Sequence, residues 1–202
     1  MTIIDSRAEE RLRQGFKRYL NPFMLTMWRL GMGKWFKIWP DVTGSVMVLM
    51  HLGRKTGIRR YQPLNYAIID GDIHCIAGFG DVSDWYRNIK ADPRVEVWLP
   101  DGWWAGVAED ISDSPARAQL IRQVMIGSGF AAYAAGLNPR KMTDEEINTE
   151  SAKYRLLRIH RSEARTGPGG PGELEWVWQL ATMVLLGLLF FRRPPRAQRP
   201  DR

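Results

Sequence analysis

The sequence predicts an α+β fold in which β-structure dominates, as a small β-barrel or an α+β sheet with helices at its periphery. Three observations support this prediction. The middle of the chain holds several short runs of apolar and β-branched residues, most of the links between them are of turn length, and helical patterns flank them. The regular alternation of strands and long helices that is typical of a parallel βαβ sheet is not seen.

Residues 1–44 are expected to form helices and a loop that precede the β-rich part. Apolar residues recur at helical spacing from Arg7 to Leu20, which predicts an amphipathic helix that packs on the domain or lies on a membrane surface. Asn21 and Pro22 have the chemistry of a helix start, so a second helix is expected to run to about Leu30. The segment Gly31–Pro40 mixes aromatic residues and lysines around two glycines and is interpreted as a loop.

Residues 45–165 carry the strand patterns. Asp70-Gly71 and Pro100-Asp101-Gly102 have the composition of tight turns and define two hairpins. The expected strands are Val46–Leu52, Arg60–Asp70, Ile73–Ala77, Val95–Leu99, Trp103–Glu109 and Lys153–Arg161. The expected helices of this part are Trp85–Lys90, Ser112–Ile126 and a looser patch at Phe130–Ala135.

The C-terminal part differs in composition from the rest. Thr166–Gly172 (TGPGGPG) is a Gly/Pro linker, residues 173–193 are expected to form a hydrophobic helix, and residues 194–202 are a basic tail. Trp176–Phe191 has no formal charge, with tryptophans at its start and arginines after its end, which favours a membrane anchor. At about 1.5 Å per residue it is short for a hydrocarbon core of roughly 30 Å, so a helix at the interface or one packed on the protein remain alternatives. We expect the protein to be membrane-associated, with its main domain in the cytoplasm.

The net charge of +7 is concentrated in two places, which limits the kinds of partner. The stretch Gly53–Arg60 and the tail Arg192–Arg202 each carry a net +4, so the remaining residues sum to −1. Duplex DNA binding needs many phosphate contacts along one face, so a nucleic-acid partner is not expected. One cysteine and three scattered histidines argue against a metal site.

The basic stretch is the strongest candidate for a binding site. Arg54, Lys55 and Thr56 can hold a phosphate or carboxylates, and Gly53 and Gly57 let backbone N–H groups approach an anion closely. On charge alone, a solvated basic turn explains the same residues. His74 and Cys75 are interpreted as structural, and nothing in the spacing of Ser, His and Asp residues indicates a catalytic triad.

Several linked motifs resemble the deazaflavin-dependent nitroreductase and quinone reductase family. GRKTGIRRYQPLNY (residues 53–66) is similar to its GRKSG-x-x-R-x-x-PL pattern. HCIAGFGDVSDWYRNIKADPRVEVWL (residues 74–99) follows with a glycine-containing loop, a W-Y-x-N helix and a V-x-V strand. The resemblance implies a split β-barrel and coenzyme F-420, an 8-hydroxy-5-deazaflavin with a phosphate and an oligoglutamate tail. FMN or haem is a less favoured cofactor.

The resemblance also implies roles for individual residues. The residues that would contact the phosphate and the glutamates are Arg54, Lys55, Thr56 and Arg60. The deazaflavin ring would be lined by Pro63, Leu64 and Asn65 on one side and by Ala77, Gly78 and Phe79 on the other. The site would be closed by Trp85, Tyr86 and Asn88. Tyr133 is the candidate for an acceptor-facing donor. No metal is implied.

The expected function is an oxidoreductase that transfers a hydride to a lipophilic acceptor such as a quinone or a nitro compound. The hydrophobic segment Trp176–Phe191 motivates the quinone, because a membrane-held enzyme meets membrane-dissolved acceptors. The alternative is a non-catalytic accessory subunit that the same segment tethers to a membrane protein complex. Two features motivate it: that hydrophobic segment, and Gly78-Phe79-Gly80 in place of the Ser-Lys-Gly-Gly of many family members.

Overall fold

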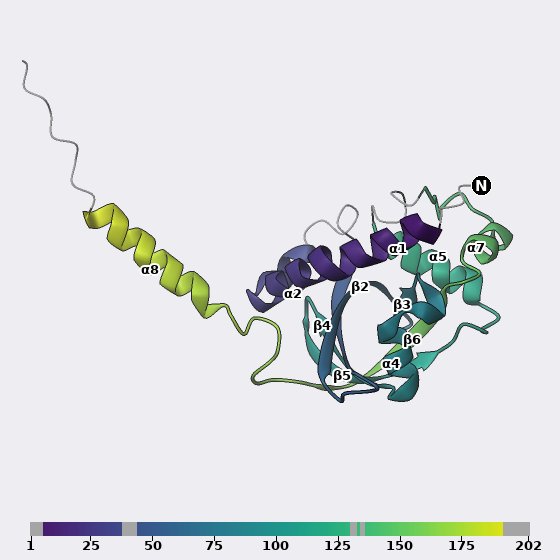
Figure 1. Ribbon diagram of the computed structural model, residues 1–202, viewed down its shortest axis with the longest axis horizontal. Coiled ribbons are helices and arrows are strands. Elements are labelled where there is room, and N and C mark those ends of the chain that lie inside the picture. The colour runs from purple at the N-terminus through teal and green to yellow at the C-terminus, as the bar shows by residue number, and fades with distance from the viewer. Residues whose placement is uncertain (1–5, 38–43, 130–132, 134–135, 192–202) are drawn as a thin grey trace, which may run out of the picture.

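The fold is a closed antiparallel β-barrel flanked by helices (Figure 1). The computed structural model describes residues 6–37, 44–129, 133 and 136–191. Within these residues, six strands follow one another around the barrel in the order β1-β2-β3-β6-β5-β4, and β4 pairs with β1 to close it. The strands are β1 (Val46–Leu52), β2 (Arg59–Ile69), β3 (Asp72–Ala77), β4 (Arg94–Leu99), β5 (Gly102–Asp110) and β6 (Arg155–Ala164).

Helices precede, interrupt and follow the strands. Before the barrel lie α1 (Ser6–Gly15), the π-helical turn η1 (Phe16–Leu20), α2 (Asn21–Arg29) and the 3-10 turn η2 (Met32–Lys37). Between strands lie η3 (Gly80–Val82), α4 (Asp84–Ala91), α5 (Arg117–Gly127) and α7 (Asp144–Glu150), and α8 (Trp176–Phe191) ends the described chain. Helices α1 and α2 cross one end of the barrel, and α5 and α7 lie beside it (Figure 1).

Strand β1 shows how the sequence produces this arrangement. Successive side chains of a strand point to opposite faces. Met47 and Leu49 are fully buried in the barrel interior, whereas Val48 is fully buried outside it, among Trp28 of α2, Trp98 and Trp103. A strand covered on both faces must be apolar throughout, and this accounts for the continuous run VMVLM.

Helix α4 contributes to the barrel interior. Its Trp85, Tyr86 and Ile89 are buried with the inward-facing residues of the strands. A second core lies under α5 and α7, where Ile121 and Ile147 are fully buried. The packing therefore fixes α4 against the barrel, where it can position side chains.

The six predicted strands are confirmed, with ends that shift by up to three residues. Four helical features differ from the prediction. The segment Gly31–Pro40, interpreted as a loop, contains the 3-10 turn η2. The helix expected over Arg7–Leu20 changes to π-helical geometry at Phe16, the helix expected from Ser112 begins at Arg117, and α7 was not predicted. Most of the patch predicted at Phe130–Ala135 lies outside the described residues.

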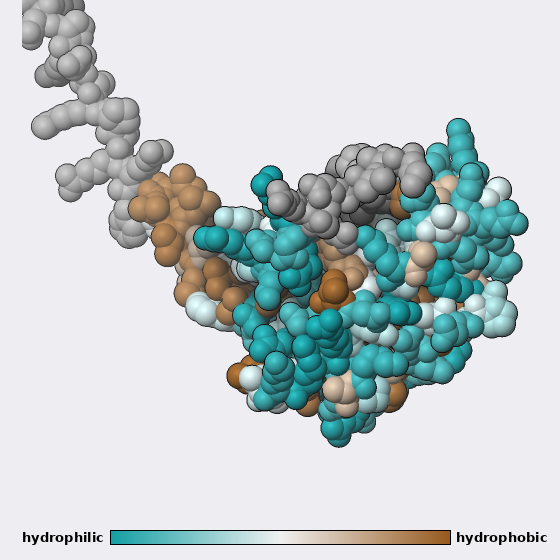
Figure 2. Space-filling view, turned by 45° about the vertical axis from the view of Figure 1, so that its right-hand side comes forward, coloured by the Kyte–Doolittle hydropathy of each residue, from teal (hydrophilic) through white to brown (hydrophobic). Residues whose placement is uncertain are grey.

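The predicted hydrophobic helix is present as α8 and extends away from the barrel (Figure 1). Its apolar side chains form an exposed surface (Figure 2), with Leu185 58% and Leu188 64% exposed. α8 has 16 residues, and no helix in the described part of the chain is both long and apolar enough to cross a membrane. A membrane-spanning form of the predicted anchor is therefore not found in this part of the chain, because the apolar segment lacks the necessary length.

Candidate functional site

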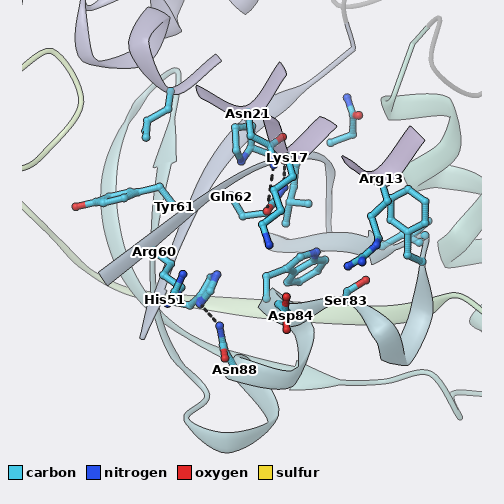
Figure 3. A pocket seen from close by; sticks show the side chains of 18 of the residues that line it. Arg13, Lys17, Asn21, His51, Arg60, Tyr61, Gln62, Ser83, Asp84 and Asn88 are labelled. Carbon is cyan, nitrogen blue, oxygen red and sulfur yellow. Dashed lines mark hydrogen bonds between the residues drawn. The ribbon is translucent and has the colours of Figure 1, made fainter. Parts of the chain in front are cut away.

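A cavity of about 900 Å³ opens between the N-terminal helices, the β1–β2 loop, strand β2 and helix α4 (Figure 3). Its volume is in the usual range for small-molecule and cofactor sites. α1, η1 and α2 form one wall, and residues of β1, β2, β3, α4 and α5 form the others. The site therefore joins segments that are far apart in the sequence.

Cationic side chains dominate the polar part of the lining. Among the described residues, the lining contains one carboxylate, Asp84, and five cationic side chains: Arg13, Lys17, Arg54, Lys55 and Arg60. This donor set suits a ligand with several negative charges. Among the described residues, no group of three or more His, Cys, Asp or Glu side chains could hold a metal ion.

A tight turn after β1 presents the basic residues to the cavity. The amide of Gly53 donates to the carbonyl of Ile58 at 2.9 Å, and the amides of Thr56 and Gly57 donate back to the carbonyl of Gly53 at 3.0 and 2.7 Å. Gly57 has a φ of +65°, a conformation that favours glycine. A Cβ on Gly53 would come within 2.8 Å of Nε of Arg60, so a side chain there would displace this arginine.

Helix α4 holds Arg54 in place. The backbone amide and the Nη1 of Arg54 both donate to Oδ1 of Asn88, at 3.2 and 2.8 Å. Its Nη2 lies 3.3 Å from Oδ1 of Asp84, in an ion pair at the start of the same helix. Asn88 is only 3% exposed. The Arg54 guanidinium is thus oriented before any ligand arrives.

His51 completes this polar group from the end of β1. It is 3% exposed and lines the cavity, and its Nδ1 lies 3.3 Å from Nδ2 of Asn88 (Figure 3). Burial lowers the pKa of His51 to about 4, and the nearby charge of Arg60 acts in the same direction. His51 is therefore neutral near pH 7.

Apolar side chains form another part of the lining. Leu64 of β2, Ile76 of β3, Trp85 of α4 and Met125 of α5 come from four elements that surround the cavity, and Phe79 adds an aromatic ring. Trp85 also belongs to the barrel core. Such a wall fits the flat face of a fused ring system.

The cavity brings together most of the residues that the sequence pointed to. Those that line it are Arg54, Lys55, Thr56, Arg60, Pro63, Leu64, Asn65, Gly78, Phe79, Trp85 and Asn88. Ala77, Tyr86 and Tyr133 are not among its lining residues. Ala77 is buried in the barrel core, and the Tyr133 side chain is 45% exposed.

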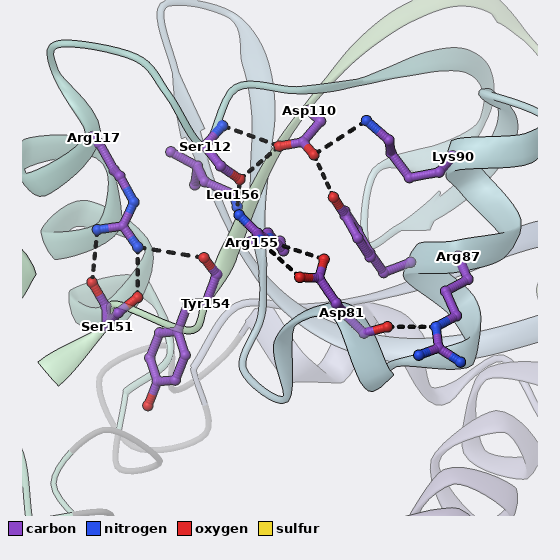
Figure 4. A network of polar contacts seen from close by, with 11 residues as sticks. Asp81, Arg87, Lys90, Asp110, Ser112, Arg117, Ser151, Tyr154, Arg155 and Leu156 are labelled. Carbon is purple, nitrogen blue, oxygen red and sulfur yellow. Dashed lines mark hydrogen bonds and ion pairs between the residues drawn. The ribbon is translucent and has the colours of Figure 1, made fainter.

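Tyr86 takes part in a different polar group, at the end of β5. Its hydroxyl donates to Oδ2 of Asp110 at 2.5 Å, Nζ of Lys90 lies 3.5 Å from the same oxygen, and Ser112 donates to Oδ1 (Figure 4). Burial alone would raise the pKa of Asp110, but the hydrogen bonds from Ser112 and Tyr86 hold it below its usual range. This group ties α4 to β5 and does not face the cavity.

The N-terminal wall and His51 are the parts that sequence reasoning missed. Arg13 and Lys17 lie within the amphipathic helix predicted over Arg7–Leu20 and were not assigned to a site. Nδ2 of Asn21, at the start of α2, lies 3.4 Å from Oε1 of Gln62 on β2. Cationic residues at i and i+4 were the available signal, but a solvated helix face shows the same pattern. His51 is an isolated polar residue within an apolar strand, which is a signal that could have been used.

The family model described as F420H(2)-dependent quinone reductase matches residues 27–143. A search of curated proteins finds no match.

Solved structures similar to this chain include a conserved hypothetical protein from Mycobacterium tuberculosis, with 24% identity, a TM-score of 0.46, and coverage of 61% of this chain and 76% of that one. An F420-H2 dependent reductase (FDR-A) shares 21% identity, with a TM-score of 0.43 and coverage of 57% and 94%. The heme storage protein HutZ from Vibrio cholerae shares 14% identity, with a TM-score of 0.44 and coverage of 69% and 94%.

Proposed function

This chain belongs to the F420H(2)-dependent quinone reductase family, so it is an oxidoreductase that uses coenzyme F-420, and we propose that the cavity between α1, β2 and α4 binds this cofactor. The observation that carries the proposal is the set of five cationic side chains on the cavity wall, one of which is already oriented by Asn88 and Asp84.

The residues present fit the two chemical parts of the cofactor. The phosphate and the oligoglutamate tail are anionic and match Arg54, Lys55 and Arg60, which can form charge-assisted hydrogen bonds. The deazaflavin is a flat fused ring and matches the apolar wall that includes Leu64 and Trp85. The cavity is large enough to hold both parts partly enclosed.

Bound coenzyme F-420 supplies a hydride, so the protein itself needs neither a nucleophile nor a strong base. The task of its residues is to hold and orient the reactants and to exclude water. The basic turn anchors the anionic end, and the apolar wall positions the ring. The N-terminal helices lie across one end of the barrel (Figure 1) and contribute Arg13, Lys17 and Asn21 to the cavity lining.

Fluorescence titration with coenzyme F-420 tests the binding site. We expect Arg54→Ala and Lys55→Ala each to weaken binding by about 1–3 kcal/mol, since each removes a charge-assisted hydrogen bond. Arg94→Ala is the matched control, because Arg94 is exposed, pairs with Asp92 and does not line the cavity. Unchanged affinity in both variants would place the anionic end of the cofactor elsewhere.

We propose a lipophilic acceptor, with a quinone preferred over a nitro compound. The family description and the apolar wall support this preference. Steady-state oxidation of the reduced cofactor, with a short-chain quinone and a nitroaromatic compound in parallel, measures it. Binding of the cofactor without turnover of any quinone would contradict the proposed acceptor class.

We also propose that α8 attaches the enzyme to a membrane surface. The helix is apolar on all sides, so no face of it is suited to water, and a helix of this kind is stable in lipid or in a protein core. Trp176 and Trp178 at its start have the chemistry of interfacial anchors. Such an attachment would keep the cavity close to membrane-dissolved acceptors.

Sedimentation with phospholipid vesicles tests the attachment. We expect Leu185→Glu together with Leu189→Glu to abolish co-sedimentation, because charges on the apolar surface oppose its transfer into lipid. The control is Ile68→Glu, which places the same charge at an apolar residue of the barrel that is 50% exposed. Equal co-sedimentation of all variants would show that α8 is not the attachment.

The accessory-subunit alternative has less support than the enzyme. Family membership makes the chain an oxidoreductase. Gly78 and Phe79, from the loop that motivated the alternative, line the cavity without filling it.

A further inference from the structure

His51 is a buried polar residue that the proposed cofactor site does not yet use. It follows Met47 and Leu49 on the inward face of β1 and lies where the barrel interior opens into the cavity. A buried imidazole costs free energy unless it is hydrogen-bonded, and the partners of His51 are the Asn88 amide and the backbone of Leu52. The position therefore has a role that an apolar residue would not fill.

The hydrogen bonds around Asn88 determine which way its amide faces. Both groups of Arg54 that meet Asn88 are obligatory donors, namely the backbone N–H and the guanidinium Nη1. The amide oxygen must therefore face Arg54, and the amide nitrogen must face His51. Because that nitrogen can only donate, Nδ1 of His51 must accept, and the ring carries its proton on Nε2.

The surroundings of His51 favour this neutral form. Arg60 on β2 and Arg54 in the turn are the cations near it. Burial lowers the pKa of its ring to about 4, and this effect outweighs a backbone hydrogen bond at Leu52 that acts in the opposite direction. Arg13 of α1 and Lys17 of η1 line the same cavity. Asp84 of α4 is the one carboxylate in its lining within the described part of the chain, and it is already paired with Arg54. The imidazole therefore remains an acceptor across the physiological pH range.

We propose that His51 is a positioning residue: its unprotonated Nδ1 fixes the Asn88 amide, and Asn88 in turn holds the Arg54 guanidinium against the anionic part of the cofactor. The inference rests on the proposed function, because Arg54 has a ligand to meet only if the cavity binds one. It goes beyond that function by assigning cofactor affinity to a residue that need not touch the cofactor.

Two substitutions separate acceptor chemistry from packing. Asn at position 51 keeps an acceptor, since its Oδ1 is attached to Cγ just as Nδ1 is in histidine, whereas Phe keeps the ring shape without any acceptor. We expect His51→Phe to weaken binding of coenzyme F-420 about tenfold, because the Asn88 amide loses its partner, and His51→Asn to bind it like the wild type. Retained affinity in His51→Phe, or equal losses in both variants, would overturn the proposal.

A double-mutant cycle tests whether His51 acts through Arg54. We expect His51→Phe to have no further effect on affinity in an Arg54→Ala background, whereas independent roles would give additive losses. His74→Phe is the matched control, because His74 is 4% exposed, lies on β3 and does not line the cavity. It should bind the cofactor like the wild type.

The protonation state of His51 can be measured without any variant. In the full-length wild type, ¹⁵N chemical shifts at pH 7 should show an unprotonated Nδ1 and a protonated Nε2. A protonated Nδ1 would overturn the proposal, regardless of how the variants fold. Wild-type protein that fails to bind coenzyme F-420 would instead contradict the proposed function, so the two failures are distinguishable.

Discussion

At the scale of single residues, the buried histidines link the stability of this protein to pH. Burial lowers the pKa of His51 to about 4 and also lowers that of His74, although hydrogen bonding and Asp72 act in the opposite direction on His74. In the unfolded chain both rings have their ordinary pKa near 6.5. Between these values the unfolded state binds more protons than the folded state, so stability falls as the pH falls.

We expect the free energy of unfolding to decrease by about 2 kcal/mol for His51 alone between pH 7 and pH 5, because each pKa unit corresponds to about 1.4 kcal/mol. Urea denaturation followed by tryptophan fluorescence at the two pH values measures it. The pKa of Asp92 is lowered by its hydrogen bonds with Arg94, so its protonation changes the free energy of unfolding only at lower pH. In His51→Asn this contribution should vanish, and a pH dependence equal to that of the wild type would contradict it.

Residue-level prediction succeeded where chemistry is encoded locally. The basic turn 53–60 could be recognised because its glycines and cations are consecutive, and the cavity contains its Arg54, Lys55 and Thr56. Arg13 and Lys17 could not be assigned to the site, because only the packing of the N-terminal helices over the barrel brings them to it. Their charge pattern alone is that of any exposed helix face.

At the scale of elements, α4 lies between the cavity and the barrel core, and its Tyr86 belongs to the core. We expect Tyr86→Phe to lower the free energy of unfolding by about 1–2 kcal/mol, since it removes a hydrogen bond to the Asp110 carboxylate. Affinity for coenzyme F-420 should not change, because Tyr86 does not line the cavity. Chemical denaturation and cofactor titration of the same variant measure both quantities.

The opposite result would be equally informative. A Tyr86→Phe variant of unchanged stability and weakened cofactor binding would place the hydroxyl in the site, as the resemblance to the family implies. The neighbouring residue Trp85 differs from Tyr86 in this respect, because it both lines the cavity and packs in the barrel core.

The elements that sequence reasoning predicted well are those with strong local signals. Asp70-Gly71 defined the β2–β3 hairpin, and Asp70 indeed has a φ of +52°.

Helix α7 was not predicted because Ile147 is its one buried residue, so apolar periodicity is lacking. Its capping box at Thr143 and Glu146 was a readable signal. The helix predicted from Ser112 starts later because the Ser112 hydroxyl is committed to Asp110 and to the amide of Leu156.

At the scale of the whole molecule, a barrel with a basic cavity is joined to an exposed apolar helix. The glycine-rich segment between them docks at its C-terminal end: the amide of Gly172 donates to the carbonyl of Trp28 at 3.0 Å, and Glu173 pairs with Arg29 at 2.9 Å. Nε1 of Trp178 donates to the carbonyl of Leu30. The surroundings of α8 could not be derived from its sequence, because apolarity alone suits lipid, an interface or a protein core equally.

Removal of residues 176–202 tests whether the barrel and α8 are independent of each other. The melting temperature should change by less than about 3 °C, because the loss at the base of α8 is one exposed hydrogen bond and few buried contacts. Cofactor affinity and turnover of a water-soluble quinone should persist, while co-sedimentation with vesicles should be lost. Glu173 is retained in this truncation, so the ion pair with Arg29 remains. A large fall in melting temperature would mean that α8 packs on the barrel in solution, and its apolar surface would then be part of the core and unavailable to a membrane.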